Sequence, residues 1–280
     1  MKSPQLHLLD KSEGREEALV LIRGYLSERK KEPEDNAQWL HAVRASGWRG
    51  AIYHLWWDAS SSPAFLLNAL FALTRVPLPP PQRALQFLGR AGITASALLL
   101  HWKKVKHRAK KVGRDHLAEL LGQVPENPLT LMGFSLGALI IYDGLMSLTG
   151  RPSFSIRDVI LLGGTITEAK KRQWEKAIEP VEGTLINVFN TRDYMLRYIF
   201  RLGQLNPKQP CGLTPIPFDH PRILNVDATG EISGSPKNHW EHVKALPTTI
   251  GWLYDGDDSV GFKAAPLSRM PRPSHGISLK

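Results

Sequence analysis

The stretch Pro128-Leu-Thr-Leu-Met-Gly-Phe-Ser-Leu-Gly-Ala-Leu-Ile-Ile-Tyr142 places a G-x-S-x-G motif between two apolar runs. The run before Gly133 is typical of a buried strand, and the run after Gly137 is typical of a helix. A serine at such a turn projects its hydroxyl above the sheet, and the two glycines let the backbone segments approach each other closely. At the start of the helix, the backbone N–H of Leu136 would face a developing oxyanion. The motif therefore predicts Ser135 as a nucleophile.

Two later segments supply an acid and a base in the matching order. Asp193 follows an apolar run, Gly183–Phe189, that predicts a strand. His239 follows a last short predicted strand, Arg222–Val226, and a polar loop. The chain order Ser, Asp, His is that of the α/β-hydrolases. An imidazole activates a serine by taking its proton during attack, and an aspartate holds the imidazole in the required tautomer.

Each of these two assignments has an alternative that the sequence leaves open. His242 lies three residues after His239 and is the rival base, while Asp227 is the rival acid. Asp193 also fits a structural role as the N-cap of a predicted helix, Tyr194–Arg201, because Asp is favoured at that position.

The remaining apolar runs predict the fold class. Glu17–Arg23, Gly50–Trp57 and Arg157–Gly163 read as further strands, and Asn36–Ala45 reads as a helix. Strands that alternate with helices predict a mainly parallel sheet flanked by helices, here the α/β-hydrolase fold. Tyr25 follows the first of these strands, so its backbone N–H is the expected second oxyanion donor, with that of Leu26 as the alternative.

Two segments stand apart from this alternation. About seventy residues separate the second predicted strand from the third, which is far longer than an ordinary loop. We expect a helical insertion at about 60–121, over or beside the active site, within a single hydrolase domain that spans residues 1–255. In the alternative, these helices are ordinary core helices on the sheet. The tail 256–280 is rich in Gly, Pro, Ser and basic residues and is predicted to be disordered.

Composition limits the class of protein. A chain of 280 residues with 42% hydrophobic content can bury a large core, and the single cysteine, Cys211, suits a reducing compartment. With neither a signal core nor about eighteen consecutive apolar residues, the sequence predicts a cytoplasmic location, with peripheral membrane contact as an extension. Zinc-ligand spacings and phosphate-binding loops are absent from the sequence, so we expect no metal and no cofactor.

The net charge of +10 is concentrated in one segment, Lys103–Arg114, which holds seven basic residues. One interpretation is a solvated helix surface. The other is attraction to anionic lipid headgroups, which the neighbouring apolar residues favour. Nucleic acid is the less favoured partner, because the chain carries no motif for it.

The segments around the three candidate residues resemble a poorly characterised family of α/β-hydrolases. The resemblance rests on Leu131–Leu145, Leu185–Arg201, Asn225–His239 and Gly24–Ser27, and it covers about residues 15–250. Eukaryotic members are described as transmembrane and coiled-coil domain proteins. The resemblance implies a Ser135–Asp193–His239 triad and a lipase or esterase activity, while this chain departs from those members in having no credible membrane span.

The sequence as a whole predicts a serine hydrolase that cleaves a lipid or acyl ester through an acyl-enzyme. The alternative from another class is a non-catalytic α/β-hydrolase-like protein that binds a partner or a membrane surface.

Overall fold

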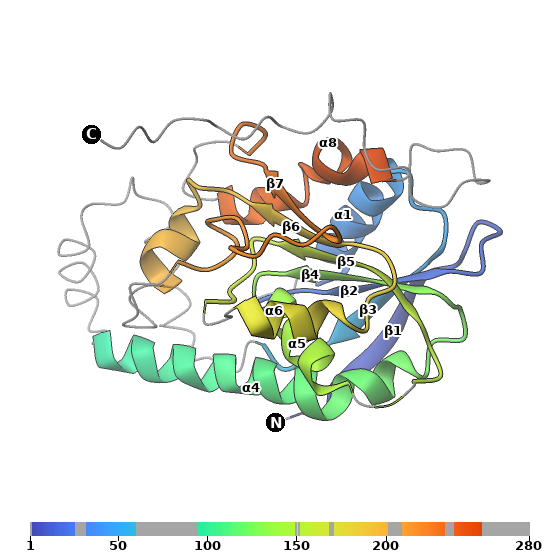
Figure 1. Cartoon of the computed structure of the whole chain (residues 1–280), viewed down its shortest axis with the longest axis horizontal. Coiled ribbons are helices and arrows are strands. Elements are labelled where there is room, and N and C mark those ends of the chain that lie inside the picture. The colour runs from blue at the N-terminus through green and yellow to red at the C-terminus, as the bar shows by residue number, and fades with distance from the viewer. Residues whose placement is uncertain are drawn as a thin grey trace.

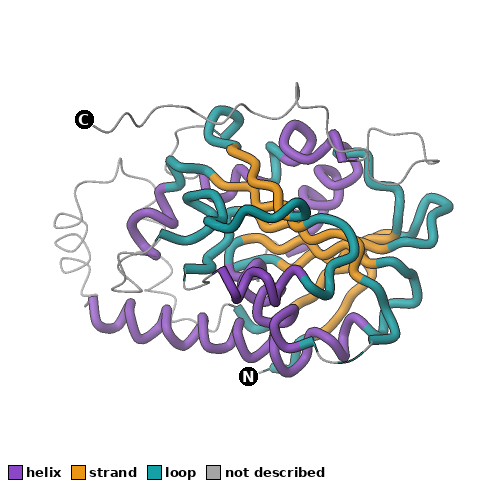
Figure 2. The backbone as a smooth tube through the Cα atoms, viewed as in Figure 1, coloured by secondary structure: helices purple, strands orange, loops and turns teal. Residues whose placement is uncertain are grey.

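A seven-stranded sheet with helices on both faces forms the centre of the computed structural model (Figure 1; Figure 2). The structure describes residues 2–25, 32–59, 95–148, 150, 152–167, 171–200, 209–232 and 238–253. The strands are β1 (Gln5–Asp10), β2 (Ala18–Ile22), β3 (Ala51–Trp56), β4 (Leu129–Phe134), β5 (Ile156–Leu162), β6 (Leu185–Phe189) and β7 (Ile223–Asp227).

The order of the strands in the sheet creates a position at which a ligand could bind. The sheet runs β1-β3-β2-β4-β5-β6-β7, and every pair is parallel except β1 and β3, which are antiparallel. The chain moves outward from β2 to β3 and then returns to place β4 on the other side of β2. Ligands of open α/β sheets bind at such a switch point, beyond the carboxyl ends of the strands. This topology is that of the α/β-hydrolase fold, and its switch point lies between β2 and β4.

The burial and residue patterns of the strands explain which strands could be predicted from the sequence. Every residue of β2 and of β4 is buried, as expected for strands covered on both faces, and their continuous apolar runs predicted them correctly. Mostly apolar runs also predicted β3, β5, β6 and β7, although β7 is only partly buried. The edge strand β1 was missed because it is mostly exposed or half-buried and mixes Leu with Gln, His and Asp.

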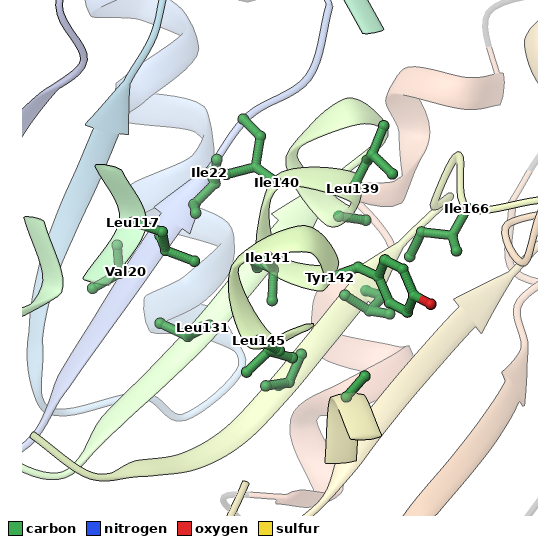
Figure 3. Close-up of a cluster of buried hydrophobic side chains, with 14 of the residues drawn as sticks. Val20, Ile22, Leu117, Leu131, Leu139, Ile140, Ile141, Tyr142, Leu145 and Ile166 are labelled. Carbon is green, nitrogen blue, oxygen red and sulfur yellow. The ribbon is translucent and has the colours of Figure 1, made fainter. Parts of the chain in front are cut away.

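Helices cover the two faces of the sheet separately. On one face, α4 (Ala95–Leu121), α5 (Leu136–Ser147) and α6 (Lys171–Ile178) bury apolar side chains against β2, β4 and β5. On the other face lie α1 (Glu32–Ala45) and α8 (Leu246–Ile250). Figure 3 shows part of the first cluster, where side chains of α5 lie beside those of β2 and β4.

Helix α4 packs on α5 at very short range. A Cβ atom on Gly113 would lie 2.4 Å from the carbonyl oxygen of Ile140, and one on Gly144 would lie 2.2 Å from Leu117 Cδ2. Glycine is therefore needed on both helices. Within the predicted insertion at 60–121, α4 packs on the sheet as a core helix, which is the alternative that the sequence left open. Residues 60–94 and the predicted tail 256–280 lie outside the described residues.

The described helices can be compared with the prediction that the chain has no membrane-spanning helix. Over the ranges that the structure describes, none of the helices is both long enough and apolar enough to cross a membrane.

Candidate active site

Ser135 occupies a strained turn between β4 and α5. Its φ of 57° and ψ of −114° make it the one non-glycine residue with positive φ in the described part of the chain. Such a conformation costs on the order of 1–3 kcal/mol, and the surrounding packing must enforce it. Its N–H donates to the carbonyl oxygen of Leu162 on the neighbouring strand β5, at 2.9 Å.

The two flanking glycines allow this turn. A Cβ atom on Gly137 would lie 1.9 Å from the carbonyl oxygen of Ile22, and one on Gly133 would lie 2.7 Å from the backbone of Ala138. Any side chain at either position would force the backbones apart and move Ser135. Both glycines therefore have a steric role in the turn.

The segment after β2 lies directly against this turn. A Cβ atom on Gly24 would lie 2.6 Å from Ser135 Cβ and 3.1 Å from the backbone nitrogen of Leu136. Leu136 is the first residue of α5, so its amide has no acceptor within the helix. The close approach of Gly24 brings the next residue, Tyr25, to the edge of the same site.

Asp193 and His239 form a buried pair. His239 Nδ1 lies 2.6 Å from Asp193 Oδ2, and the two side chains are 4% and 0% exposed. The second oxygen, Asp193 Oδ1, accepts from the backbone N–H of Leu196 at 3.0 Å and so caps a π-helical turn, Met195–Phe200. The capping role and the histidine contact, which the sequence posed as alternatives, use different oxygens of one carboxylate.

Asn238 connects the loop that carries Asp193 to the turn that carries His239 through two hydrogen bonds. Its Nδ2 donates to the carbonyl oxygen of Arg192 at 2.7 Å, and its Oδ1 accepts from the N–H of Tyr194 at 3.2 Å. The amide thus bonds to the residues on both sides of Asp193 and immediately precedes His239. It is fully buried. Asn238 was not predicted as a site residue, because nothing in the local sequence pattern distinguishes it from an asparagine in an exposed loop.

His239 also approaches the serine. Its ring lies against Phe134, the residue before Ser135, with 4.7 Å between ring centroids. His239 and Ser135 line one cavity, together with five apolar or aromatic side chains. These are Tyr25, Trp102, Met195, Leu196 and Trp240.

This cavity is small. Its volume of about 20 Å³ is close to the space that one water molecule needs. Ligand pockets are usually of about 300–1,000 Å³, so a ligand of ordinary size would fit only after the lining side chains move. A wider hollow of about 900 Å³ lies along α6 between Met146 and Arg222, but Ser135, Asp193 and His239 do not line it.

The rival acid and base lie elsewhere. Asp227 is exposed, and its Oδ1 accepts from the N–H of Thr229 at 2.9 Å in a local turn. His242 is fully buried behind His239 and does not line the cavity of Ser135. Neither of its ring nitrogens has a partner among the described residues. Burial lowers the pKa of His242 to about 4, although the charge of Asp193 opposes that shift.

A second buried histidine, His54 on β3, is held neutral in the same way. Arg23 Nε donates to His54 Nε2 at 3.1 Å, so this nitrogen acts as an acceptor. Burial lowers the pKa of His54 to about 3, with smaller contributions from the charges of Arg23 and His7.

These two histidines make the fold sensitive to acid. In the unfolded chain both have the usual pKa of about 6.5, so between pH 6.5 and pH 4 the unfolded state binds more protons than the folded state. Their contribution to stability is fully present above pH 6.5 and is lost as the pH falls. From pH 7.5 to pH 5, we expect the free energy of unfolding to fall by about 4 kcal/mol through these two groups.

Urea unfolding at the two pH values measures this change. His54→Gln keeps an acceptor for Arg23 and should remove about half of the pH dependence. The matched control is His41→Gln, at an exposed position of α1, which should leave it unchanged. An equal pH dependence in His54→Gln and the parent would contradict the expectation.

The described residues also bear on metal binding. Among them, no group of three His, Cys, Asp or Glu side chains is arranged to hold a metal ion.

Residues 93–252 match the model of a family described as "Protein of unknown function (DUF726)". The chain is similar to an uncharacterized membrane protein of Caenorhabditis elegans, F35D11.3, at 38% identity over 172 residues, covering 60% of this chain and 26% of that protein. It is similar to the transmembrane and coiled-coil domain-containing protein STS1 of Oryza sativa subsp. japonica at 36% identity, covering 48% of this chain and 20% of that protein.

A relative in Saccharomyces cerevisiae carries the name "Probable lipase MIL1" and is 27% identical, covering 53% of this chain and 14% of that protein. The chain therefore spans about a quarter or less of the length of these relatives. Among solved structures, the poly(3-hydroxybutyrate) depolymerase LpqC from Bordetella parapertussis is similar over 95% of this chain and 87% of that chain, with 11% identity and a TM-score of 0.41.

Proposed function

Because the chain belongs to the DUF726 family of proteins of unknown function, its chemistry has to be inferred from its own residues, and we propose that it is a serine hydrolase. One observation carries the proposal. The buried Asp193–His239 pair shares a cavity with Ser135, which is held in a strained turn at the switch point of the sheet. Asp193 and His239 arrive from loops more than fifty residues beyond Ser135, so local sequence does not account for their convergence.

The geometry suits acyl transfer to the serine. The N–H at His239 Nδ1 donates to the Asp193 carboxylate, which leaves Nε2 free to accept the Ser135 proton as Oγ attacks the ester carbonyl carbon. The backbone N–H groups of Leu136 and Tyr25 stabilise the resulting oxyanion. His239 then returns the proton to the leaving alcohol, and the acyl-enzyme remains. A water molecule, deprotonated by His239, releases the acid and restores Ser135.

The cavity lining favours an apolar acyl group. Tyr25, Trp102 and Trp240 contribute aromatic surface, and Met195 and Leu196 contribute aliphatic surface. No acidic or basic side chain apart from His239 is among the described residues that line it. A charged acyl chain would lose its hydration there without gaining a partner, whereas a fatty or short alkyl ester would not. The similarity to a relative named as a probable lipase supports the same substrate class.

A second candidate function is a non-catalytic one, in which the hydrolase-like fold binds a partner or a membrane surface. The small volume of the cavity is the observation in its favour. Covalent labelling separates the two functions, because a protein that only binds has no activated serine.

The decisive experiment is reaction with a fluorophosphonate probe, followed by mass spectrometry of the labelled peptides. We expect one adduct, on Ser135, in the folded protein and none after heat denaturation. An adduct at another serine, or equal labelling before and after denaturation, would assign the reactivity to something other than this site.

Asp193→Asn is expected to lower turnover by about 10⁴-fold, by analogy with the corresponding change in other triads. The new amide would donate a hydrogen bond to His239 Nδ1, so the neutral imidazole would carry its proton on Nε2. Nε2 could then no longer accept the proton of Ser135. Its oxygen can still accept from Leu196, and Asn caps about as well as Asp, so the thermal midpoint should change little. The measurement is hydrolysis of a small soluble ester together with thermal unfolding.

Asp227→Asn is the matched control for this prediction. It makes the same chemical change at the rival acid, where the side chain serves a local turn, and should keep a near-normal rate. A normal rate in Asp193→Asn would remove Asp193 from the mechanism.

A further inference from the structure

Helix α4 has one buried side and one strongly basic exposed side. Its buried residues include Trp102, Val105, Ala109, Val112, Leu117 and Leu120. The exposed residues recur every three or four positions, as one side of a helix requires. Up to residue 114 they are Leu100, Lys103, Lys104, His107, Lys111 and Arg114, and beyond it they are Asp115, Ala118 and Glu119.

The structure sorts the seven basic residues of this segment. Arg108 is largely buried and lies 3.5 Å from Asp58, and Lys106 and Lys110 are half-buried. The other four, Lys103, Lys104, Lys111 and Arg114, are exposed on the outer side of α4. We call these four residues, together with Leu100, the basic face of α4.

The charge pattern of this face is poorly suited to a surface that meets only water. Residues 95–114 contain no acidic residue, and the first one, Asp115, follows the last cation of the face. Solvated helix surfaces usually alternate the two signs, because opposite charges three or four residues apart stabilise a helix and like charges destabilise it. Asp115, four residues after Lys111, is the one acidic neighbour of this face within the described helix α4, which indicates that most of the compensating charge comes from a partner.

An exposed apolar residue lies at the same end of the helix as the candidate site. Leu100 is 69% exposed, while Trp102, two residues further on, lines the cavity of Ser135. The basic face thus starts at the same level along α4 as Trp102, on the opposite side of the helix. From there it continues along α4, which forms one edge of the molecule (Figure 1). From residue 100 to residue 114 the helix rises by about 21 Å, enough to contact several lipid headgroups.

We propose that the basic face of α4 docks on a membrane surface that contains anionic lipids. The four cations contact the headgroups, and Leu100 enters the boundary between headgroups and acyl chains. A lipid surface fits better than a nucleic acid because the face combines its cations with an exposed leucine. The docking does not depend on catalysis. Its consequence, that the cavity beside Trp102 meets esters of the same membrane, rests on the proposed function.

The test is co-sedimentation of the full chain with vesicles of phosphatidylcholine, with and without phosphatidylserine, at physiological salt. The variant carries Lys103→Glu, Lys104→Glu, Lys111→Glu and Arg114→Glu. Each basic residue near an anionic surface contributes about a fivefold factor in affinity, so this variant should bind at least roughly 10³-fold more weakly. A control with the same net charge carries Lys11→Glu, Arg172→Glu, Lys176→Glu and Lys244→Glu, all at exposed positions of other elements, and should bind like the wild type.

Three results would overturn the proposal. In the first, the wild type does not sediment with the anionic vesicles. In the second, both variants lose binding equally, which would assign it to net charge alone. In the third, the wild type binds a duplex oligonucleotide and not the vesicles. Thermal unfolding shows that both variants are folded, and binding is measured without turnover, so a failure of the serine hydrolase proposal leaves this result interpretable.

Discussion

Ser135→Ala is expected to abolish covalent labelling by a fluorophosphonate and to lower ester hydrolysis by about 10⁶-fold, as loss of the nucleophile does in serine proteases. The remaining rate over water would come from the oxyanion donors and from substrate binding. Alanine keeps the Cβ atom and has a similar backbone preference, so the turn and the packing against Gly24 should persist. The thermal midpoint is therefore expected to stay close to that of the wild type.

A matched serine lies on the adjoining helix. Ser147, near the end of α5, donates its hydroxyl hydrogen to the carbonyl oxygen of Asp143 at 2.8 Å and does not line the cavity. Ser147→Ala should label and hydrolyse like the wild type. Undiminished labelling of Ser135→Ala would show that another residue is the nucleophile and would remove the basis for the serine hydrolase proposal.

His239→Ala is the second change with a very large expected effect, again about 10⁶-fold in turnover. It also leaves the Asp193 carboxylate buried without its partner, which destabilises folded proteins by about 3–5 kcal/mol. A lower rate in His239→Ala alone could therefore come from lost catalysis or from lost stability. His239→Gln separates the two, because an amide can donate to Asp193 but cannot take a proton from Ser135. It should be nearly as inactive as His239→Ala and more stable.

His242→Ala is the comparison for these variants. His242 is as buried as His239 but lies behind it, so its removal should lower stability through the cavity that it leaves. The rate per folded molecule should stay within about tenfold of the wild type. The measurement is turnover normalised to the folded fraction. A greater loss of rate in His242→Ala than in His239→Gln would identify His242 as the base.

The parts of this molecule that sequence predicts are those with a strong local pattern. The strands β2 to β7 are mostly apolar runs, and G-x-S-x-G between a strand and a helix predicts a close turn because only glycine avoids the clash with Ile22. The order of Ser135, Asp193 and His239 then suggested that they converge. The contact between Asp193 and His239, at 2.6 Å, joins residues that are far apart in the sequence, so no local sequence pattern could predict it.

Other features could not be predicted because they depend on contacts between distant segments. Strand β1 is stabilised by pairing with β3, and its own residues are too polar to form a recognisable strand pattern in the sequence. The packing of α4 depends on the close approach of Gly113 to α5, so the sequence left open whether this segment is an insertion or a core helix. Asp193 shows a different limit. The sequence offered capping and catalysis as alternatives, whereas a carboxylate has two oxygens and can serve two partners.

The two hydrogen bonds of the Asn238 amide have a mechanical consequence. They join the loop of Asp193 to the turn of His239, so we expect these two residues to move together. Ser135 belongs to another segment, the junction of β4 and α5, which meets the first through the ring contact between Phe134 and His239. Under the proposed function, an opening of the cavity for a substrate would widen the gap between the two segments and keep the Asp193–His239 pair intact. Reassembly of the site would then require one distance to be recovered rather than two, which would lower the conformational entropy lost in each turnover.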